Sequence, residues 1–126
     1  MSHFTTIKTS MIELEYIKKG LTDLGYPFQE GNVTVRGFAG GKTTADLKVA
    51  ANRRYDIGFR KTNQNYEIVA DWWGIRKIKQ EAFSQQLTQR YAYHATVAKL
   101  EEQGFTLTEE LQQQNGGIHL TLRRVI

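Results

Sequence analysis

The feature that most constrains the fold of this chain is a change in the spacing of its hydrophobic residues. Residues 10–24 and 80–103 repeat hydrophobic side chains about every 3.6 positions, as amphipathic α-helices do. Residues 45–70 instead alternate hydrophobic and polar side chains, as half-buried β-strands do. A chain that uses both periods in separate stretches is expected to be an α+β protein.

The two helical stretches have recognisable ends. The first is predicted to begin near Ser10, an N-cap residue with Glu13 in capping-box spacing, and to stop at Gly25. The second is predicted to run from about Gln80 to Gln103, where Gly104 stops it. Each has one apolar stripe, made of Met11, Leu14, Ile17, Leu21 and Leu24 in the first helix and of Phe83, Leu87, Tyr91, Ala95 and Ala98 in the second.

Strands are expected between and around the helices. Residues 33–35, 45–50, 55–60 and 66–70 are separated by short, turn-rich breaks, which favours an antiparallel sheet with a central four-stranded meander. One more strand is expected before the first helix, and Asn115-Gly116 predicts a hairpin near the carboxyl end.

The number of helices sets how the layers are expected to pack. Two helices of this length cover one sheet face but hardly two, so both are expected on the face that carries Tyr55, Ile57 and Phe59. The other face would then present mixed charges to water or to a partner, namely Asp46, Lys48, Asp56, Arg60 and Glu67.

Length and composition favour one soluble domain over residues 1–126. The chain is 40% hydrophobic and has a single proline, and no Pro/Ser-rich linker divides it. It has no cysteine, which suits a reducing compartment and excludes disulfides and thiolate metal sites. No signal peptide and no run of about 18 apolar residues is recognisable, so a cytoplasmic protein without a membrane span is expected, or a stromal one if a plastid encodes it.

The net charge of +4 is unevenly distributed. Residues 36–79 contain ten Lys or Arg against four Asp or Glu, whereas the remainder has seven against nine. This excess favours an acidic partner: nucleic acid, an acidic protein surface or a phosphorylated ligand. Arg53 and Arg54 lie at one turn of the expected meander, and Arg36 and Lys42 lie toward the other end of their strands. We therefore expect the charges to be spread over both ends of the sheet.

No motif indicates an enzyme. Residues 40–44 (GGKTT) resemble the end of a phosphate-binding P-loop, but Arg36 stands where that motif needs a glycine, so a hairpin turn is favoured. His3, His94 and His119 have no metal-ligand spacing, and no serine has a nucleophile-elbow context. The sequence predicts no catalytic residue, no metal site and no cofactor.

Two residue clusters are candidates for binding a partner. Arg90, Tyr91 and His94 lie within one helical turn. They either present a ligand site or form a helix edge whose side chains hydrogen-bond to the sheet, the interpretation we favour. Trp72 and Trp73 are adjacent, so one is either covered by residues 74–79 or exposed at a contact surface.

Several short phrases along the chain carry a family resemblance: residues 1–4 (MSHF), 35–38 (VRGF), 55–59 (YDIGF), 66–71 (YEIVAD) and 89–94 (QRYAYH). With them the chain resembles the conserved hypothetical chloroplast open reading frame family number thirty-five, a family of unknown function in plastids and cyanobacteria. The resemblance implies a stromal or cyanobacterial cytoplasmic setting and a housekeeping or photosynthesis-linked accessory role. It implies no activity, cofactor or active site.

Two functional hypotheses follow. The first is a non-enzymatic adaptor or accessory protein that binds another protein or a second copy of itself, through the sheet or the edge at Trp72 and Trp73. The alternative is a nucleic-acid-binding module of the basic segment, with weak affinity of roughly 10⁻⁴ to 10⁻⁶ M because interleaved acidic residues repel phosphate. The stacking groups would be Tyr55, Phe59, Trp72 or Trp73, and the candidate partner-binding residues are Trp72, Trp73, Arg53, Arg54, Arg60, Arg90, Tyr91 and His94.

Overall fold

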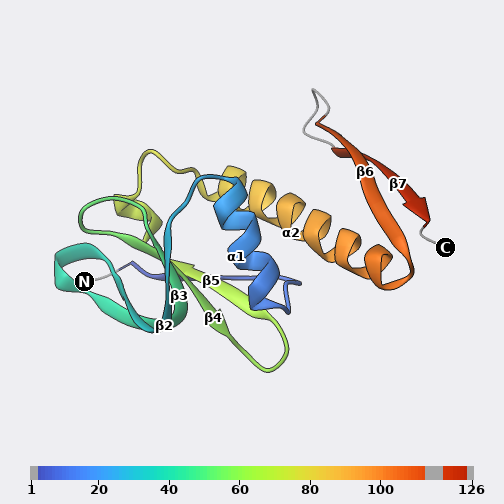
Figure 1. Cartoon of the computed structure of the whole chain (residues 1–126). Coiled ribbons are helices and arrows are strands. Elements are labelled where there is room, and N and C mark those ends of the chain that lie inside the picture. Colours follow the sequence, from blue (N-terminus) through green and yellow to red (C-terminus); the bar gives the residue numbers. More distant parts are fainter. Residues whose placement is uncertain (1–2, 113–117, 125–126) are drawn as a thin grey trace.

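The computed structural model describes residues 3–112 and 118–124, with side chains for residues 3–105. Within these residues the elements follow the order strand, helix, four strands, helix, two strands (Figure 1). Their bounds are β1 Thr5–Lys8, α1 Leu14–Asp23, β2 Phe28–Arg36, β3 Lys42–Ala50, β4 Asp56–Lys61, β5 Tyr66–Ala70, α2 Gln80–Glu102, β6 Phe105–Gln112 and β7 Ile118–Arg124, with short 3-10 turns at Phe38–Gly40 (η1) and Trp72–Gly74 (η2).

The main sheet has five strands in the order β1-β5-β4-β3-β2. Each strand pairs antiparallel with its neighbours, so β2 to β5 form the predicted four-stranded meander. The strand expected before the first helix is β1, which pairs with β5 from Thr5 opposite Ala70 to Lys8 opposite Glu67. The α+β class with an antiparallel sheet is therefore confirmed.

Both helices cover one face of this sheet, as predicted (Figure 1). Ile57 and Phe59 of β4 are fully buried in a core that includes Ile17 of α1 and Phe83 and Leu87 of α2. Further along α2 the predicted stripe is only half-buried, at Tyr91, Ala95 and Ala98.

The first helix begins later than its sequence predicted. Ser10 is not its N-cap: α1 starts at Leu14, and Glu13 at the N-cap position makes no side-chain capping bond. The hydroxyl of Tyr91 accepts hydrogen bonds from the backbone N–H groups of Ile12 and Glu13, at 3.0 and 2.9 Å. These bonds come from the other helix, and a search for local caps therefore misses them.

The second face of the sheet was expected to be open to water or to a partner, but part of it is covered. The distal half of the β2–β3 hairpin curls across it, so Val35 and Ala45 pack with Val69 in a second, smaller core. Gly58 makes this possible, because a Cβ atom built there would lie 2.4 Å from a methyl group of Val35. Register shifts within β2 between Glu30 and Val33, where the strand bends.

The charged residues predicted on this face are there, but the hairpin changes their surroundings. Asp56 is completely buried, with no exposed surface. Arg60 forms a half-buried ion pair with Glu67 at 2.8 Å, and Asp46 accepts a hydrogen bond from the backbone of Lys61.

The predicted C-terminal hairpin consists of β6 and β7, which form a two-stranded sheet of their own. The residues expected in its turn, Asn115 and Gly116, lie outside the described part of the chain. Figure 1 shows this hairpin beyond the end of α2, away from the five-stranded sheet. No helix among residues 3–112 and 118–124 is long and apolar enough to cross a membrane.

Candidate functional site

A pocket of about 530 Å³ lies where the tip of the β2–β3 hairpin meets the turn before β4 and η2. Four cationic residues line it, Arg36, Lys42, Arg53 and Arg54, together with the rings of Phe38, Tyr55 and Trp73. We call these seven residues the basic pocket. Its volume falls within the range of small-ligand pockets, about 300 to 1,000 Å³.

The prediction that these charges would be spread over both ends of the sheet is wrong. In a flat meander the nine residues of β3 would hold Lys42 and Arg53 roughly 30 Å apart, at about 3.3 Å per residue. The curl of the hairpin instead brings its tip back over the start of β4 and the end of β5, so both groups line one pocket.

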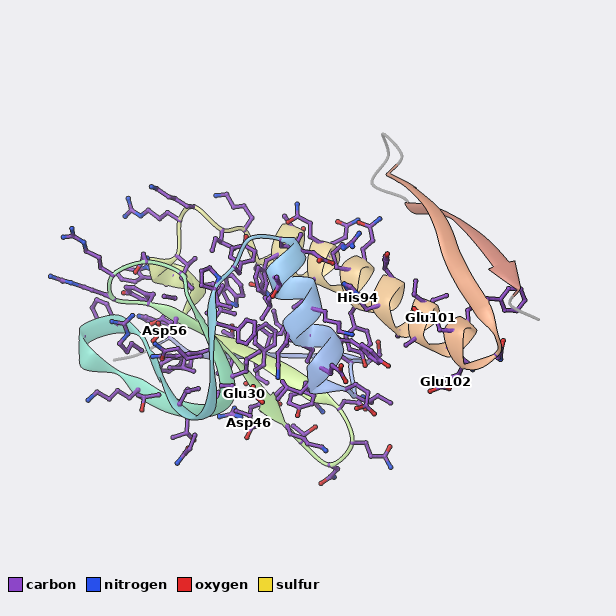
Figure 2. The ribbon with its side chains drawn as sticks, viewed as in Figure 1. Glu30, Asp46, Asp56, His94, Glu101 and Glu102 are labelled. Atoms are coloured by element: carbon purple, nitrogen blue, oxygen red, sulfur yellow. The ribbon has the colours of Figure 1, made fainter. Side chains whose placement is uncertain are left out.

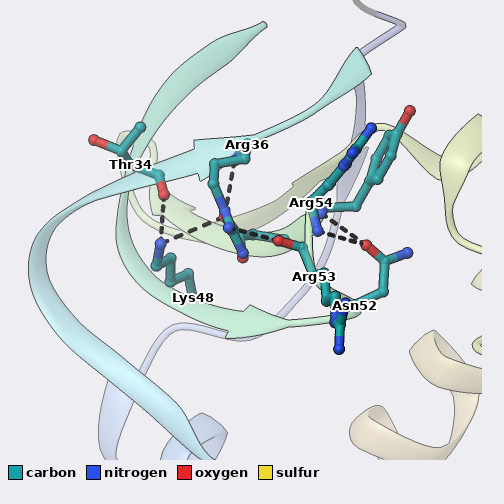
Figure 3. A network of polar contacts seen from close by, with 8 residues as sticks. Thr34, Arg36, Lys48, Asn52, Arg53 and Arg54 are labelled. Atoms are coloured by element: carbon teal, nitrogen blue, oxygen red, sulfur yellow. Dashed lines mark hydrogen bonds and ion pairs between the residues drawn. The ribbon is translucent and has the colours of Figure 1, made fainter. Parts of the chain in front are cut away.

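Asp56 fixes one side of the pocket by holding Arg36, which Figure 3 shows bonded to Arg53. Its carboxylate accepts hydrogen bonds from the backbone N–H, Nε and Nη2 of Arg36 at 2.8 to 2.9 Å, and Lys48 Nζ lies 3.4 Å away. Arg36 also donates from Nη1 to the carbonyl of Arg53 at 2.8 Å. Burial raises the pKa of Asp56, but the hydrogen bonds and charge of Arg36 outweigh it, so this pKa lies below its ordinary value.

Asp71 fixes the tip of the hairpin in a similar way. This fully buried carboxylate accepts hydrogen bonds from the backbone N–H groups of Phe38 at 2.9 Å and His3 at 3.2 Å, both at Oδ2. Among the described residues its Oδ1 has no partner. Asp56 and Asp71 together hold β2 and η1 against the sheet, so the fold itself shapes the pocket.

The two adjacent tryptophans have different surroundings. Trp72 is half-buried against the main core, with its ring 6.2 Å from that of Phe83, whereas Trp73 is 63% exposed. The ring of Trp73 meets Phe38 edge-on at 4.9 Å and lies 5.6 Å from His3. Of the four predicted stacking groups, Tyr55 and Trp73 line the pocket and Trp72 does not. Phe59 is fully buried, so its assignment as a stacking group is wrong.

Three cations of the pocket are not neutralised by the fold. Within the described side chains, those of Lys42, Arg53 and Arg54 form no ion pair with any acidic residue. The turn that carries the two arginines is nevertheless ordered, because Asn52 Oδ1 accepts hydrogen bonds from the backbone N–H groups of Arg54 and Tyr55.

The acidic residues expected to repel phosphate do not line this pocket. Asp56 and Asp71 are buried and hydrogen-bonded, and Glu67 is paired with Arg60. Figure 2 shows Asp46 away from the hairpin tip, and nitrogen-tipped side chains stand out at the pocket end of the molecule. The sequence predicted that acidic residues along the basic segment would repel phosphate, but at the pocket we expect no such repulsion.

The remaining candidate residues have partners in the fold. Arg60 bonds to Glu67 and to Thr43, outside the pocket. Arg90 Nη2 and His94 Nε2 lie 2.7 and 2.6 Å from Asp23 Oδ2, which ties the end of α1 to α2. Burial raises the pKa of Asp23, but hydrogen bonds from these two residues outweigh it and the net direction is downward.

These contacts give Arg90, Tyr91 and His94 a structural role, as the helix-edge interpretation expected, but the partners lie in α1 and the segment before it and not in the sheet. In the described part of the chain no group of three or more His, Asp or Glu residues is placed to hold a metal ion. Sequence reasoning missed Phe38 and Lys42 as pocket residues; their only signal was the glycine-rich turn between them, which was interpreted as an ordinary hairpin turn.

Comparison with known proteins gives a consistent family assignment. Residues 20–121 match the family described as "Protein of unknown function (DUF1257)". The chain is similar to "Uncharacterized protein ycf35" of Guillardia theta, 36% identical over 98% of both chains, and of Cyanophora paradoxa, 32% identical over 98% of both. The same protein of Pyropia yezoensis is 31% identical over 98% of both chains. No solved structure matches.

Proposed function

The chain belongs to the DUF1257 family and is similar to Ycf35 proteins, and we propose that it is a non-enzymatic accessory protein that binds single-stranded nucleic acid at the basic pocket. The observation that carries the proposal is the meeting of unpaired cations with an exposed tryptophan in one pocket. Its setting would be the plastid stroma or the cyanobacterial cytoplasm, as the family resemblance implies.

The chemistry of the pocket supports single strands over duplex. Proteins that bind single strands combine a positive surface for the phosphates with aromatic rings on which bases stack, and each stacked base contributes about 1 to 3 kcal/mol. Trp73 has an exposed ring for such a base, and Lys42, Arg53 and Arg54 supply the positive surface. A base in a duplex is already stacked on its neighbours, so the ring of Trp73 is expected to bind an unpaired base.

The experiment is a titration of labelled single-stranded RNA and DNA at near-physiological salt. We expect a dissociation constant of about 10⁻⁶ M or tighter, and a large loss on replacing Arg53 and Arg54 by Glu. Trp73→Ala should weaken binding about tenfold, the equivalent of one stacked base.

The matched control replaces Lys8 and Lys61 by Glu, which reverses two charges as the pocket variant does; both lysines are exposed, lie outside the pocket and have no ion pair among the described side chains. If the control lost as much affinity as the pocket variants, the effect would be explained by net charge alone. Binding no tighter than about 10⁻⁴ M would contradict the proposal.

A protein partner, the first of the two sequence hypotheses, is favoured by a different observation. An isolated two-stranded hairpin is marginally stable in water, and β6–β7 is separate from the main sheet. A partner or a second copy that packs on this hairpin would stabilise it. Affinity capture of the tagged protein, with and without nuclease, separates the two candidates: a protein that survives nuclease supports the adaptor, and RNA or DNA alone supports the pocket.

A further inference from the structure

A second group of cations lies directly after Trp73 in the chain. The segment 75–79, which we call the 75–79 loop, has two inward side chains: Ile75 is buried and Ile78 packs against the main core. Arg76, Lys77 and Lys79 are exposed, and no acidic partner is placed against them among the described residues. The isoleucines therefore anchor a loop that presents three positive charges to solvent.

This loop is fixed to the wall of the basic pocket. Asn52, whose Oδ1 orders the turn of Arg53 and Arg54, donates from Nδ2 to the carbonyl of Gly74 at 3.0 Å. Gly74 is also packed under the ring of Tyr55, since a Cβ atom there would lie 1.9 Å from that ring. The short turn η2, which carries Trp73, therefore joins the pocket to the 75–79 loop without a flexible connection.

The exposed charges around the basic pocket and the 75–79 loop are mostly positive. Glu81, in the first turn of α2, is the next acidic residue along the chain. In Figure 2, Glu30 and Asp46 lie in the lower half of the view, and Glu101 and Glu102 lie at the end of α2 that is far from the pocket. Trp73 lines the pocket with three of these cations and precedes the other three by three to six positions in the chain, and neither group forms an ion pair among the described side chains.

We propose that a bound single strand does not end in the pocket but continues past Trp73 onto the 75–79 loop. One base stacks on Trp73, the phosphates on one side of it lie against Lys42, Arg53 and Arg54, and those on the other side lie against Arg76, Lys77 and Lys79. This inference rests on the proposed function and extends it, because it makes the ligand a tract of several nucleotides and excludes a mononucleotide as the preferred ligand.

The test measures affinity and its salt dependence for thymidine monophosphate and for oligothymidylates of up to about eight nucleotides. The variant replaces Arg76, Lys77 and Lys79 by Gln. The control replaces Lys8, Lys61 and Lys99 by Gln, three exposed lysines elsewhere, so that both proteins lose the same charge. Circular dichroism checks that both are folded.

We expect affinity to rise with length beyond one nucleotide. The loop variant should lower the log–log salt slope for the longest oligonucleotide by about 2, since each phosphate contact on a single strand contributes roughly 0.7. Its affinity for the monophosphate and the control's slope should change little. A monophosphate that binds as tightly as the longest oligonucleotide, or a slope that the loop variant leaves unchanged, overturns the inference.

The outcomes separate this inference from the proposed function. If Arg53→Glu with Arg54→Glu abolishes binding and the loop variant has no effect, the pocket binds nucleic acid and only the extended path is wrong. If the unchanged protein binds no oligonucleotide, both are wrong.

Discussion

Two polar regions of this molecule contain the charged residues that its sequence singles out, and they differ in how far the fold uses them. Between the helices, the carboxylate of Asp23 pairs with both Arg90 and His94. The hydroxyl of Tyr91 accepts hydrogen bonds from two backbone N–H groups. At the hairpin end, Asp56 forms ion pairs with Arg36 and Lys48. The other cations of the basic pocket form no ion pair among the described side chains.

The difference shows how a structural cluster can be told from a binding surface. Groups already bonded inside the fold have little left for a ligand, since a new contact would first have to break an existing one. Among the described side chains Lys42, Arg53 and Arg54 have no ion pair to break, and they lie with one exposed ring in the pocket that we propose as the binding surface. The following predictions test this division, beginning with the largest expected effect.

Replacing Asp56 by Ala should destabilise the protein most. The change removes the charged acceptor of three hydrogen bonds from Arg36. Because the side chain of Arg36 is 41% exposed and can be hydrated, we expect a loss of about 3 kcal/mol, the upper end for a hydrogen bond to a charged group. Urea unfolding gives the free energy, and Glu101→Ala, at an exposed carboxylate with no ion pair among the described side chains, is the control. A loss no larger than the control's would show that the hairpin does not depend on Asp56.

Gly58→Ala should have the next largest effect. The added methyl group would meet Val35, Ala45 and Val69 at 2.4 to 3.1 Å, and overpacking of this kind costs about 1 to 3 kcal/mol. Adding Val35→Ala should make room for it, so the double variant should be more stable than the two separate losses predict. Strict additivity would mean that Val35 does not lie over Gly58.

Tyr91→Phe tests the other region. It removes the acceptor of two N–H groups at the start of α1, and we expect a loss of about 0.5 to 1.5 kcal/mol because water reaches these exposed donors. Thermal unfolding measures the loss. Affinity for single strands should be unchanged, and a weaker affinity would move Tyr91 from the structural region to the binding surface.

The smallest effect concerns the acid limb of stability. The pKa of Asp23 is below its ordinary 3.8, so its ionised form stabilises the folded chain above that pH, and the contribution is lost as pH falls through the lower folded value. The stability difference between the unchanged protein and Asp23→Asn should therefore shrink below about pH 3.8. Solvent screens this partly exposed group, so added salt should reduce the difference.

Sequence periodicity was sufficient for the elements but not for their curvature. The alternation at residues 45–70 predicts the strands, and Gly104 marks the end of α2 within about two residues. It cannot predict that Val35 returns over Gly58, because that contact depends on a bulge within β2 and on space left by an absent side chain.

The same limit explains the errors at the candidate site. The distance between Arg53 and Lys42 depends on how the hairpin bends. That bend cannot be predicted from the residues next to either of them in the sequence. The Ser10 cap failed for a related reason: Tyr91, which is 79 positions from Ile12, supplies the acceptor.

The position of β1 sets the order in which this protein can be completed during synthesis. Thr5 is paired with Ala70, so the first strand made has no partner until β5 has left the ribosome. At about 5 to 20 residues per second, that delay lasts several seconds. Throughout it the edge of the sheet that β1 will cover is absent, and the N-terminal segment is available to chaperones.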